Sequence, residues 1–217
     1  MNTNVLNKFE LNGKTSVLYP EIDGKIRGYG DFHHHQIRVL YQSLVLFIKT
    51  LSKDIYLTSN LMFYYEEGNP NRRFAPDLMI CFGVENKKRR TYKLWEEKQV
   101  PQVIIEVVSK ETWQKDVTTK RRLYERLGVA EYYIIDPEYK YLPSPLFAYR
   151  LEFGELVRQS INDNRIFSDL LGLELVDTDA DFRFFNPETQ EFLPTSEDLQ
   201  TKVAQLEAEI ARLKGRK

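Results

Sequence analysis

A strand, a helix and a second strand follow one another near the middle of this chain, and this unit constrains the fold more than any other feature. The run "VPQVIIEVVS" is almost continuously apolar, as expected for a strand buried on both faces. "TWQKDVTTKRRLYERLG" predicts a helix that ends at Gly128, and "EYYIID" predicts a second strand that stops at Pro137. Two strands joined in this way form a parallel pair with a right-handed crossover.

The preceding elements extend the unit to helix, strand, strand, strand, helix, strand. "HQIRVLYQSLVLFIKTLS" has apolar residues at three- and four-residue spacings, which predicts an amphipathic helix. "DIYLTSNLMFYY" and "PDLMICFGV" predict two strands separated by the turn "EEGNPNRR". The glycine-rich "YPEIDGKIRGYGDFHHH" predicts turns before the first helix. The expected fold class is therefore α/β.

The last third of the chain predicts additions to this core. "FAYRLEFGELVRQSI" predicts a hairpin that turns near Gly154, and the next segment predicts short strands that wrap the edge of the body. A heptad seam in the last segment comprises Leu199, Val203, Leu206, Ile210 and Leu213. We expect a domain over residues 1–195 and a heptad helix over 196–217. About two heptads are too few for a free-standing coiled coil, so the helix would form a homodimer with help from the body, or pack against it.

Composition indicates a soluble protein with charge concentrated in one segment. The net charge is −1, yet residues 85 to 126 hold twelve Lys/Arg against seven Asp/Glu. The single cysteine, Cys81, lies in the apolar run "LMICF" and is expected to be a buried thiol. No run of about 18 apolar residues and no leader pattern is present, so we expect a cytoplasmic protein without a membrane partner.

Two acids stand out against this background. Asp77 begins a strand after Pro76, and Glu106 lies near the end of the buried run. A carboxylate in a strand buried on both faces is costly unless it is paired or binds a metal. If the two strands are neighbours, both acids meet at one end of the sheet, where they could bind Mg²⁺. For Asp77 alone, a polar residue that merely starts a strand is equally possible.

A lysine would complete this pair of acids, but Val108, not a lysine, follows Glu106 on the same face of the predicted strand. At about 100° per residue, the apolar residues of the second predicted helix form one arc with Lys120 at its centre. A lysine there needs an anion, either Glu106 or a bound phosphate, unless it reaches past the arc to solvent. We expect Lys120 to supply the missing amine from the helix.

The chain resembles the PD-(D/E)XK nuclease superfamily and, more closely, its Uma two family of restriction-endonuclease-like proteins. The likeness rests on "APDLMI", "VIIEVVSKET", "DVTTK", "YERLGVAEYYIIDP", "YRLEFGEL" and "LGLELV", and it runs from about residue 18 to 195. It implies a three-layer restriction-endonuclease-like core (αβββαβ) with a mixed central sheet flanked by helices, followed by β-hairpin additions and a short C-terminal helix. In that family the lysine is displaced to the helix.

The resemblance also implies roles for individual residues. Asp77 and Glu106 carry over as metal-binding acids, together with the main-chain carbonyl of Val107, and Lys120 as the lysine at the attacked phosphate. Ser109, Asp116 and His35 of the first predicted helix also match recurring positions of the family. The resemblance implies that they are positioning or substrate-binding residues. Lys25 stands where the family often has an acid, so a third carboxylate ligand is not expected.

The activity implied is that of a Mg²⁺-dependent endodeoxyribonuclease, with Mn²⁺ as a substitute and double-stranded DNA as partner. Lys120 would either stabilise the transition state or help to deprotonate the attacking water. The basic segment "NKKRRTYK" lies between the two acid-bearing strands, so we expect it near the site, where it could contact phosphates. A solvated loop is at least as good an interpretation. The candidate residues are Lys87, Lys88, Arg89 and Arg90.

Two other classes of function remain open from the sequence. The first is a catalytically inactive nucleic-acid-binding or assembly module that retains the nuclease fold. The second is a structural coiled-coil adaptor, which would leave Asp77 and Glu106 unexplained. The presence of both acids together with Lys120 favours the enzyme.

Overall fold

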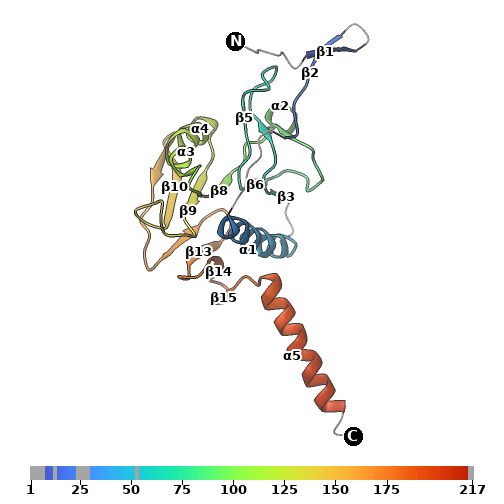
Figure 1. Cartoon of the computed structure of the whole chain (residues 1–217), viewed down its shortest axis with the longest axis vertical. Coiled ribbons are helices and arrows are strands. Elements are labelled where there is room, and N and C mark those ends of the chain that lie inside the picture. The colour runs from blue at the N-terminus through green and yellow to red at the C-terminus, as the bar shows by residue number, and fades with distance from the viewer. Residues whose placement is uncertain (1–7, 12–13, 23–29, 52–53, 215–217) are drawn as a thin grey trace.

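A six-stranded mixed sheet forms the centre of the protein (Figure 1). The structure is a computed structural model that describes residues 8–11, 14–22, 30–51 and 54–214. In spatial order the strands are β11 (Glu155–Arg158), β10 (Leu146–Glu152), β9 (Glu131–Ile135), β8 (Val103–Val107), β6 (Leu78–Phe82) and β3 (Ile55–Thr58). Only β8 and β9 are parallel within this sheet, which confirms the predicted crossover pair.

One face of the central sheet packs on α1 (Asp31–Ile48) and on a second sheet. That second sheet has the order β12 (Arg165–Ser168), β13 (Leu173–Asp177), β14 (Phe182–Asn186) and β15 (Glu191–Phe192). The buried Gln36 of α1 joins the two: its amide donates to the carbonyl of Phe182 at 2.8 Å and accepts from the N–H of Phe182 at 2.9 Å. The predicted wrapping strands are therefore an ordered sheet across α1.

The other face packs on the crossover connection, which is not a regular α-helix. It comprises α3 (Trp113–Lys115), the π-helical turn η1 (Asp116–Lys120) and α4 (Arg121–Leu127). Gly128 ends it at φ +82°, the left-handed conformation of a C-terminal cap. The end was predicted correctly, whereas the π turn has no signature in the residue pattern.

A small third sheet lies beside this face. It consists of β4 (Phe63–Tyr64), β5 (Arg73–Phe74) and β7 (Tyr92–Lys93), and α2 (Leu94–Glu97) follows β7. The single strand predicted over residues 54–65 is wrong, because the chain leaves the central sheet after Thr58. Asn60 adopts φ +54° and its N–H donates to the carbonyl of Pro76 at 3.0 Å, which redirects the chain into β4.

The predicted hairpin is confirmed. β10 and β11 pair from Tyr149↔Arg158 to Glu152↔Glu155, and the turn between them has φ +52° at Phe153 and +89° at Gly154. At the other end of the chain, β1 (Lys8–Leu11) and β2 (Lys14–Val17) form a separate antiparallel pair. The glycine-rich segment predicted before the first helix lies in part outside the described residues.

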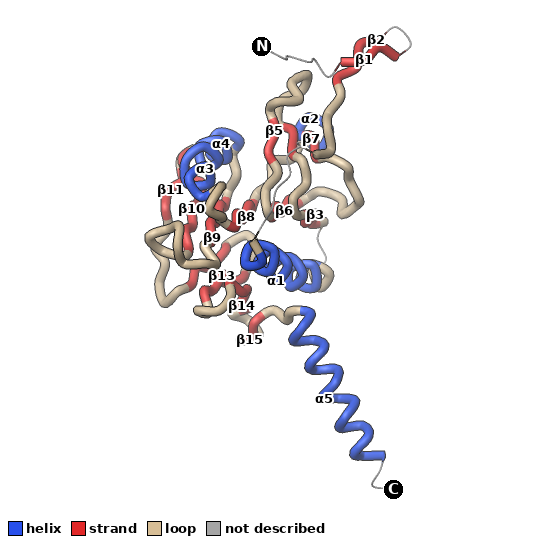
Figure 2. Tube along the Cα trace, in the orientation of Figure 1, coloured by secondary structure: helices blue, strands red, loops and turns tan. Residues whose placement is uncertain are grey.

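The C-terminal helix α5 (Ser196–Lys214) projects away from the rest of the protein (Figures 1 and 2). Every residue from 197 to 214 is exposed. No helix in the described ranges combines the length and the apolar character needed to cross a membrane.

Candidate active site

Asp77 and Glu106 meet at one edge of the central sheet because β6 and β8 are antiparallel neighbours. Leu78 pairs with Ile105, so the residue before Leu78 lies opposite the residue after Ile105. Each acid accepts a hydrogen bond from the main chain beside the other acid. Asp77 Oδ2 accepts from the N–H of Val107 at 2.8 Å, and Glu106 Oε2 accepts from the N–H of Asp77 at 3.3 Å. The structure therefore brings together the two acids that the sequence predicts.

Lys120 reaches this edge from η1. Its Nζ lies 2.9 Å from Glu106 Oε2 and 2.8 Å from Asp116 Oδ1. Residues 104, 106 and 108 share the sheet face covered by the crossover, and Val108 is buried there. The amine absent from position 108 thus comes from the helix that packs on the same face. π-helical turns often occur at functional sites.

Tyr124 is a member of the cluster that the sequence reading missed. Its hydroxyl donates to Glu106 Oε1 at 2.5 Å, and its ring makes edge-on contacts with Phe74 and Tyr132. The hydroxyl of Tyr132 in turn donates to the main-chain carbonyl of Asp116 at 3.0 Å. Tyr124 lies four residues after Lys120 on the predicted apolar arc, which is the signal that could have identified it.

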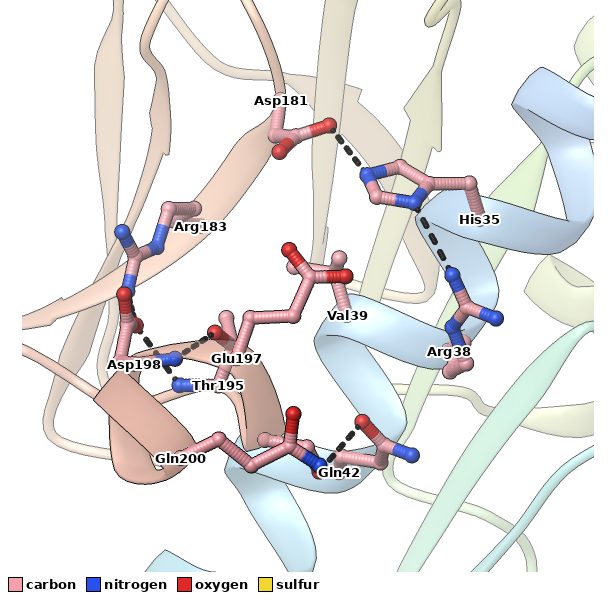
Figure 3. A pocket seen from close by; sticks show the side chains of 11 residues that line it. His35, Arg38, Val39, Gln42, Asp181, Arg183, Thr195, Glu197, Asp198 and Gln200 are labelled. Atoms are coloured by element: carbon pink, nitrogen blue, oxygen red, sulfur yellow. Dashed lines mark hydrogen bonds and ion pairs between the residues drawn. The ribbon is translucent and has the colours of Figure 1, made fainter. Parts of the chain in front are cut away.

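The first-helix histidine at the site is His33, not His35. His33 Nε2 lies 3.3 Å from Asp77 Oδ2, and His33 is 4% exposed. His35 instead contacts Asp181 Oδ1 at 2.9 Å, in a separate pocket between α1, β14 and the start of α5 (Figure 3). The buried face of α1 includes His33 and Ile37, four residues apart, whereas His35 lies on the neighbouring face and is only half-buried. The prediction that His35 is the first-helix histidine of the site is therefore corrected to His33.

Burial and neighbouring charges shift the pKa values of the acids in opposite directions. Burial raises the pKa of Asp77, but the His33 hydrogen bond and the charge of Lys120 outweigh it, and the net pKa is below its usual value. Burial, helped by Asp77 and Asp116, raises the pKa of Glu106 to about 8 although Lys120 opposes it. Burial also raises the pKa of Asp116. The surroundings therefore favour the anion of Asp77, whereas they disfavour the anions of Glu106 and Asp116.

The side chain of Lys120 has the opposite electrostatic setting. Burial lowers its pKa, but the carboxylates of Glu106, Asp116 and Asp77 together raise it well above the usual value. The ammonium form is therefore favoured. The Lys120 side chain is 23% exposed and that of Asp77 is 10% exposed, so these two groups connect the cluster to solvent.

The donor atoms fit a hard divalent cation. Three buried carboxylates, Asp77, Glu106 and Asp116, face one ammonium, so the cluster has an excess of negative charge when all are ionised. Carboxylate oxygens suit Mg²⁺, which retains several waters and needs few protein ligands. Among the described residues, no three His, Cys, Asp or Glu side chains surround one point, so a cation here would rely on two carboxylates with main-chain and water oxygens.

The other predicted residues separate into those near the cluster and those in turns. Asp116 is buried against Lys120. Ser109 lies in the turn after β8, where its N–H donates to Thr112 Oγ1 at 3.1 Å and its carbonyl accepts from Trp113. Val107 contributes its N–H to Asp77. Lys25 lies outside the described residues.

The basic segment lies away from the acids. β6 and β8 are antiparallel, so the connection between them leaves from the edge opposite Asp77 and Glu106. Arg89 lies 4.2 Å from the ring centre of Tyr56, whose strand partner Cys81 is about 13 Å from Asp77 along β6. The expectation of proximity was wrong because it relied on sequence order alone.

The ion pairs of this segment are local. Arg89, whose side chain is 5% exposed, forms two hydrogen bonds with the Glu97 carboxylate, at 2.7 and 2.9 Å. Lys87 pairs with Glu85 and Arg90 with Glu21, while Lys88 is exposed. Arg89 is therefore a structural residue that fixes the loop against the sheet.

Comparisons with known proteins identify the family of the chain. A crystal structure described as a putative nuclease belonging to DUF820, from Anabaena variabilis, is 16% identical to this chain, with a TM-score of 0.48 over 74% of this chain and 80% of that one. No curated protein matches the sequence. The model of the Uma2 family, described as "Putative restriction endonuclease", matches residues 8–179. The chain belongs to the Uma2 family.

Proposed function

We propose that this protein is a divalent-metal-dependent endonuclease that hydrolyses phosphodiester bonds in double-stranded DNA. Asp77, Glu106 and the main-chain carbonyl of Val107 would hold Mg²⁺, or Mn²⁺ in its place. The observation that carries this proposal is the convergence of Asp77, Glu106 and Lys120 from three separate elements on one edge of the sheet. Membership of a family described as restriction endonucleases supports the same activity.

The residues of the cluster would divide the chemistry among them. Mg²⁺ bound to the two acids would supply Lewis acidity at the phosphate and orient a water molecule. Lys120, kept as an ammonium by its carboxylate neighbours, would stabilise negative charge on the phosphate rather than remove a proton from water. Tyr124 and His33 would fix the orientations of Glu106 and Asp77 through the contacts described above.

Isothermal titration with Mg²⁺ and with Mn²⁺, followed by incubation with plasmid, tests the proposal. The variants are Asp77→Asn and Glu106→Gln, and the matched control is Asp181→Asn, which removes a carboxylate that faces His35 instead. We expect the first two variants to lose saturable metal binding and plasmid cleavage with unchanged circular dichroism, while the control retains both.

The inactive binding or assembly module is a separate outcome of this experiment. If wild type binds plasmid in gel shifts but neither takes up metal nor cleaves under any condition in which it stays folded, the nuclease proposal fails. If Asp77→Asn cleaves at the wild-type rate, the acids are structural and the active site lies elsewhere.

A further inference from the structure

The helix α5 carries an apolar stripe that no described part of the chain covers. Each residue of the stripe has between 41 and 55% of its surface exposed. The five residues are Leu199, Val203, Leu206, Ile210 and Leu213. They follow one another at spacings of four, three, four and three residues, the a and d positions of a heptad. The helix points away from the body in Figure 1, and all five side chains of the stripe lie on its exposed part. An exposed apolar stripe of this kind marks an interaction surface.

We propose that α5 forms a parallel, in-register, two-stranded coiled coil with α5 of a second copy of this chain. This assembly is independent of the nuclease activity proposed above. The spacing assigns Val203 and Ile210 to a positions and the three leucines to d positions. β-branched residues at a with leucine at d favour two parallel strands over trimers and tetramers.

Charges beside the seam support a second copy of the same sequence as the partner. The g and e positions that flank the seam include Lys202, Glu207, Glu209 and Lys214. In a parallel dimer the g residue of one helix faces the e residue five positions later on the other. Lys202 then faces Glu207 of the second copy, and Glu209 faces its Lys214. Both kinds of pair join opposite charges.

An antiparallel dimer fits the same residues less well. The antiparallel alignment that includes Leu213 places Leu206 opposite Ile210 of the second copy, which brings the Glu207 side chains close to each other and likewise those of Glu209. An alignment that avoids these repulsions leaves Leu213 without a partner. Only the parallel register covers all five apolar residues and pairs both sets of opposite charges.

The first turn of α5 is fixed to the body, so the coiled coil would set the relation between the two bodies. Asp198 pairs with Arg183 of β14 at 2.5 Å and accepts from the N–H of Thr195 at 2.9 Å. The hydroxyl of Ser196 donates to the side-chain oxygen of Gln42 in α1 at 2.9 Å. A parallel pair therefore holds both bodies at the same end of the coiled coil.

Sedimentation velocity on the full chain over a series of concentrations tests the assembly. We expect a mass that rises from 25.7 kDa toward twice that value, because so short a seam dissociates on dilution. Leu206→Glu places a charge in the seam and should keep the chain monomeric at every concentration. Ala208→Glu places the same charge on the outer face and should dimerise as wild type does. A wild type that stays monomeric, or a Leu206→Glu variant with the wild-type mass, overturns the proposal.

Paired charge variants test whether the second copy is recognised through its flanking charges. One chain carries Lys202→Glu with Lys214→Glu, and the other carries Glu207→Lys with Glu209→Lys. Each alone places like charges at every g–e contact and should be weakened as a homodimer. A mixture of the two restores opposite charges and should yield a heterodimer, whereas two unmixed species contradict the register.

Oxidation of Leu213→Cys tests the orientation. In the parallel pair the two introduced thiols face each other and should form an intermolecular disulfide, while in the antiparallel alignment that includes Leu213 they lie about 15 Å apart along the axis. The native Cys81 is buried and does not compete. Arg212→Cys, outside the seam, is the control for random collision. Equal crosslinking of both variants would overturn the parallel orientation.

Discussion

The Nζ of Lys120 lies 2.9 Å from Oε2 of Glu106, although Lys120 belongs to η1 and Glu106 to β8. The π turn η1 lets Lys120 and Asp116 face the same strand end while α4 continues along the sheet. The ion pair is therefore a tertiary contact between the π turn and a strand, and it does not lie within one strand.

Substitutions of Lys120 should show whether its side chain acts as a positive charge or as a base in cleavage. Lys120→Met removes the ammonium that faces Glu106 and should lower the cleavage rate by about 10²- to 10³-fold, as expected for loss of one transition-state contact. Lys120→Arg keeps a charge that cannot be lost at accessible pH and should retain more activity than Lys120→Met. Single-turnover cleavage at saturating metal measures both. Equal inactivity of the two variants, with metal binding intact, would favour a proton-transfer role.

Removal of the Tyr124 hydroxyl should lower the free energy of unfolding. Tyr124→Phe leaves a buried oxygen of Glu106 without its donor, at a cost of about 1–3 kcal/mol in the free energy of unfolding. Tyr141→Phe is the matched control, because that hydroxyl donates at 3.3 Å to Glu138 outside the buried cluster. Urea denaturation compares the two. A Tyr124→Phe variant as stable as the control would mean that the short contact contributes nothing measurable.

The two histidines of α1 should respond differently. His33→Ala removes the group that contacts Asp77 and should lower metal affinity by about 10- to 100-fold, the range for groups that orient metal ligands. His35→Ala loses contacts with Asp181 and Arg38, both away from the acids, and should bind metal as wild type does. Isothermal titration with Mn²⁺ provides the comparison. The reverse order of effects would restore His35 as the site histidine.

Cys81 should resist alkylation until the protein unfolds. Burial raises the pKa of its thiol from 9.0 to about 12, so the thiolate fraction near pH 9 is roughly 10³-fold smaller than in an unfolded chain. Because the pKa of Cys81 is higher in the folded protein, burial of the neutral thiol makes its full contribution to stability below pH 9. That contribution is lost as the pH rises through 12. Iodoacetamide labelling in native buffer and in urea, followed by mass spectrometry, measures it. Rapid labelling of the native protein would show that β6 opens readily.

The two proposals together predict how DNA is cut. If the parallel coiled coil holds two active sites on one side, wild type should convert supercoiled plasmid to linear product, whereas Leu206→Glu should accumulate nicked circles. Ala208→Glu should behave as wild type. Plasmid electrophoresis over time shows the ratio of nicked to linear product. Linear product formed equally by Leu206→Glu would mean that the two cuts do not depend on α5.

The sequence by itself determined the elements whose signals are local. The apolar strands, the crossover, the hairpin at Gly154 and the helix end at Gly128 all follow from periodicity and from turn chemistry, which act over a few residues. Asp77 and Glu106 were identifiable as candidates because a polar residue in an apolar run requires an explanation wherever the strand lies.

Tertiary structure decided which side chains meet. The antiparallel pairing of β6 and β8 brought Asp77 to Glu106 and carried the segment with Arg89 to the opposite edge, a distinction that chain order does not contain. The packing face of α1 selected His33 over His35, and η1 set the direction of Lys120. These outcomes depend on contacts between elements distant in sequence, where a change of one residue in phase turns a side chain toward a different neighbour.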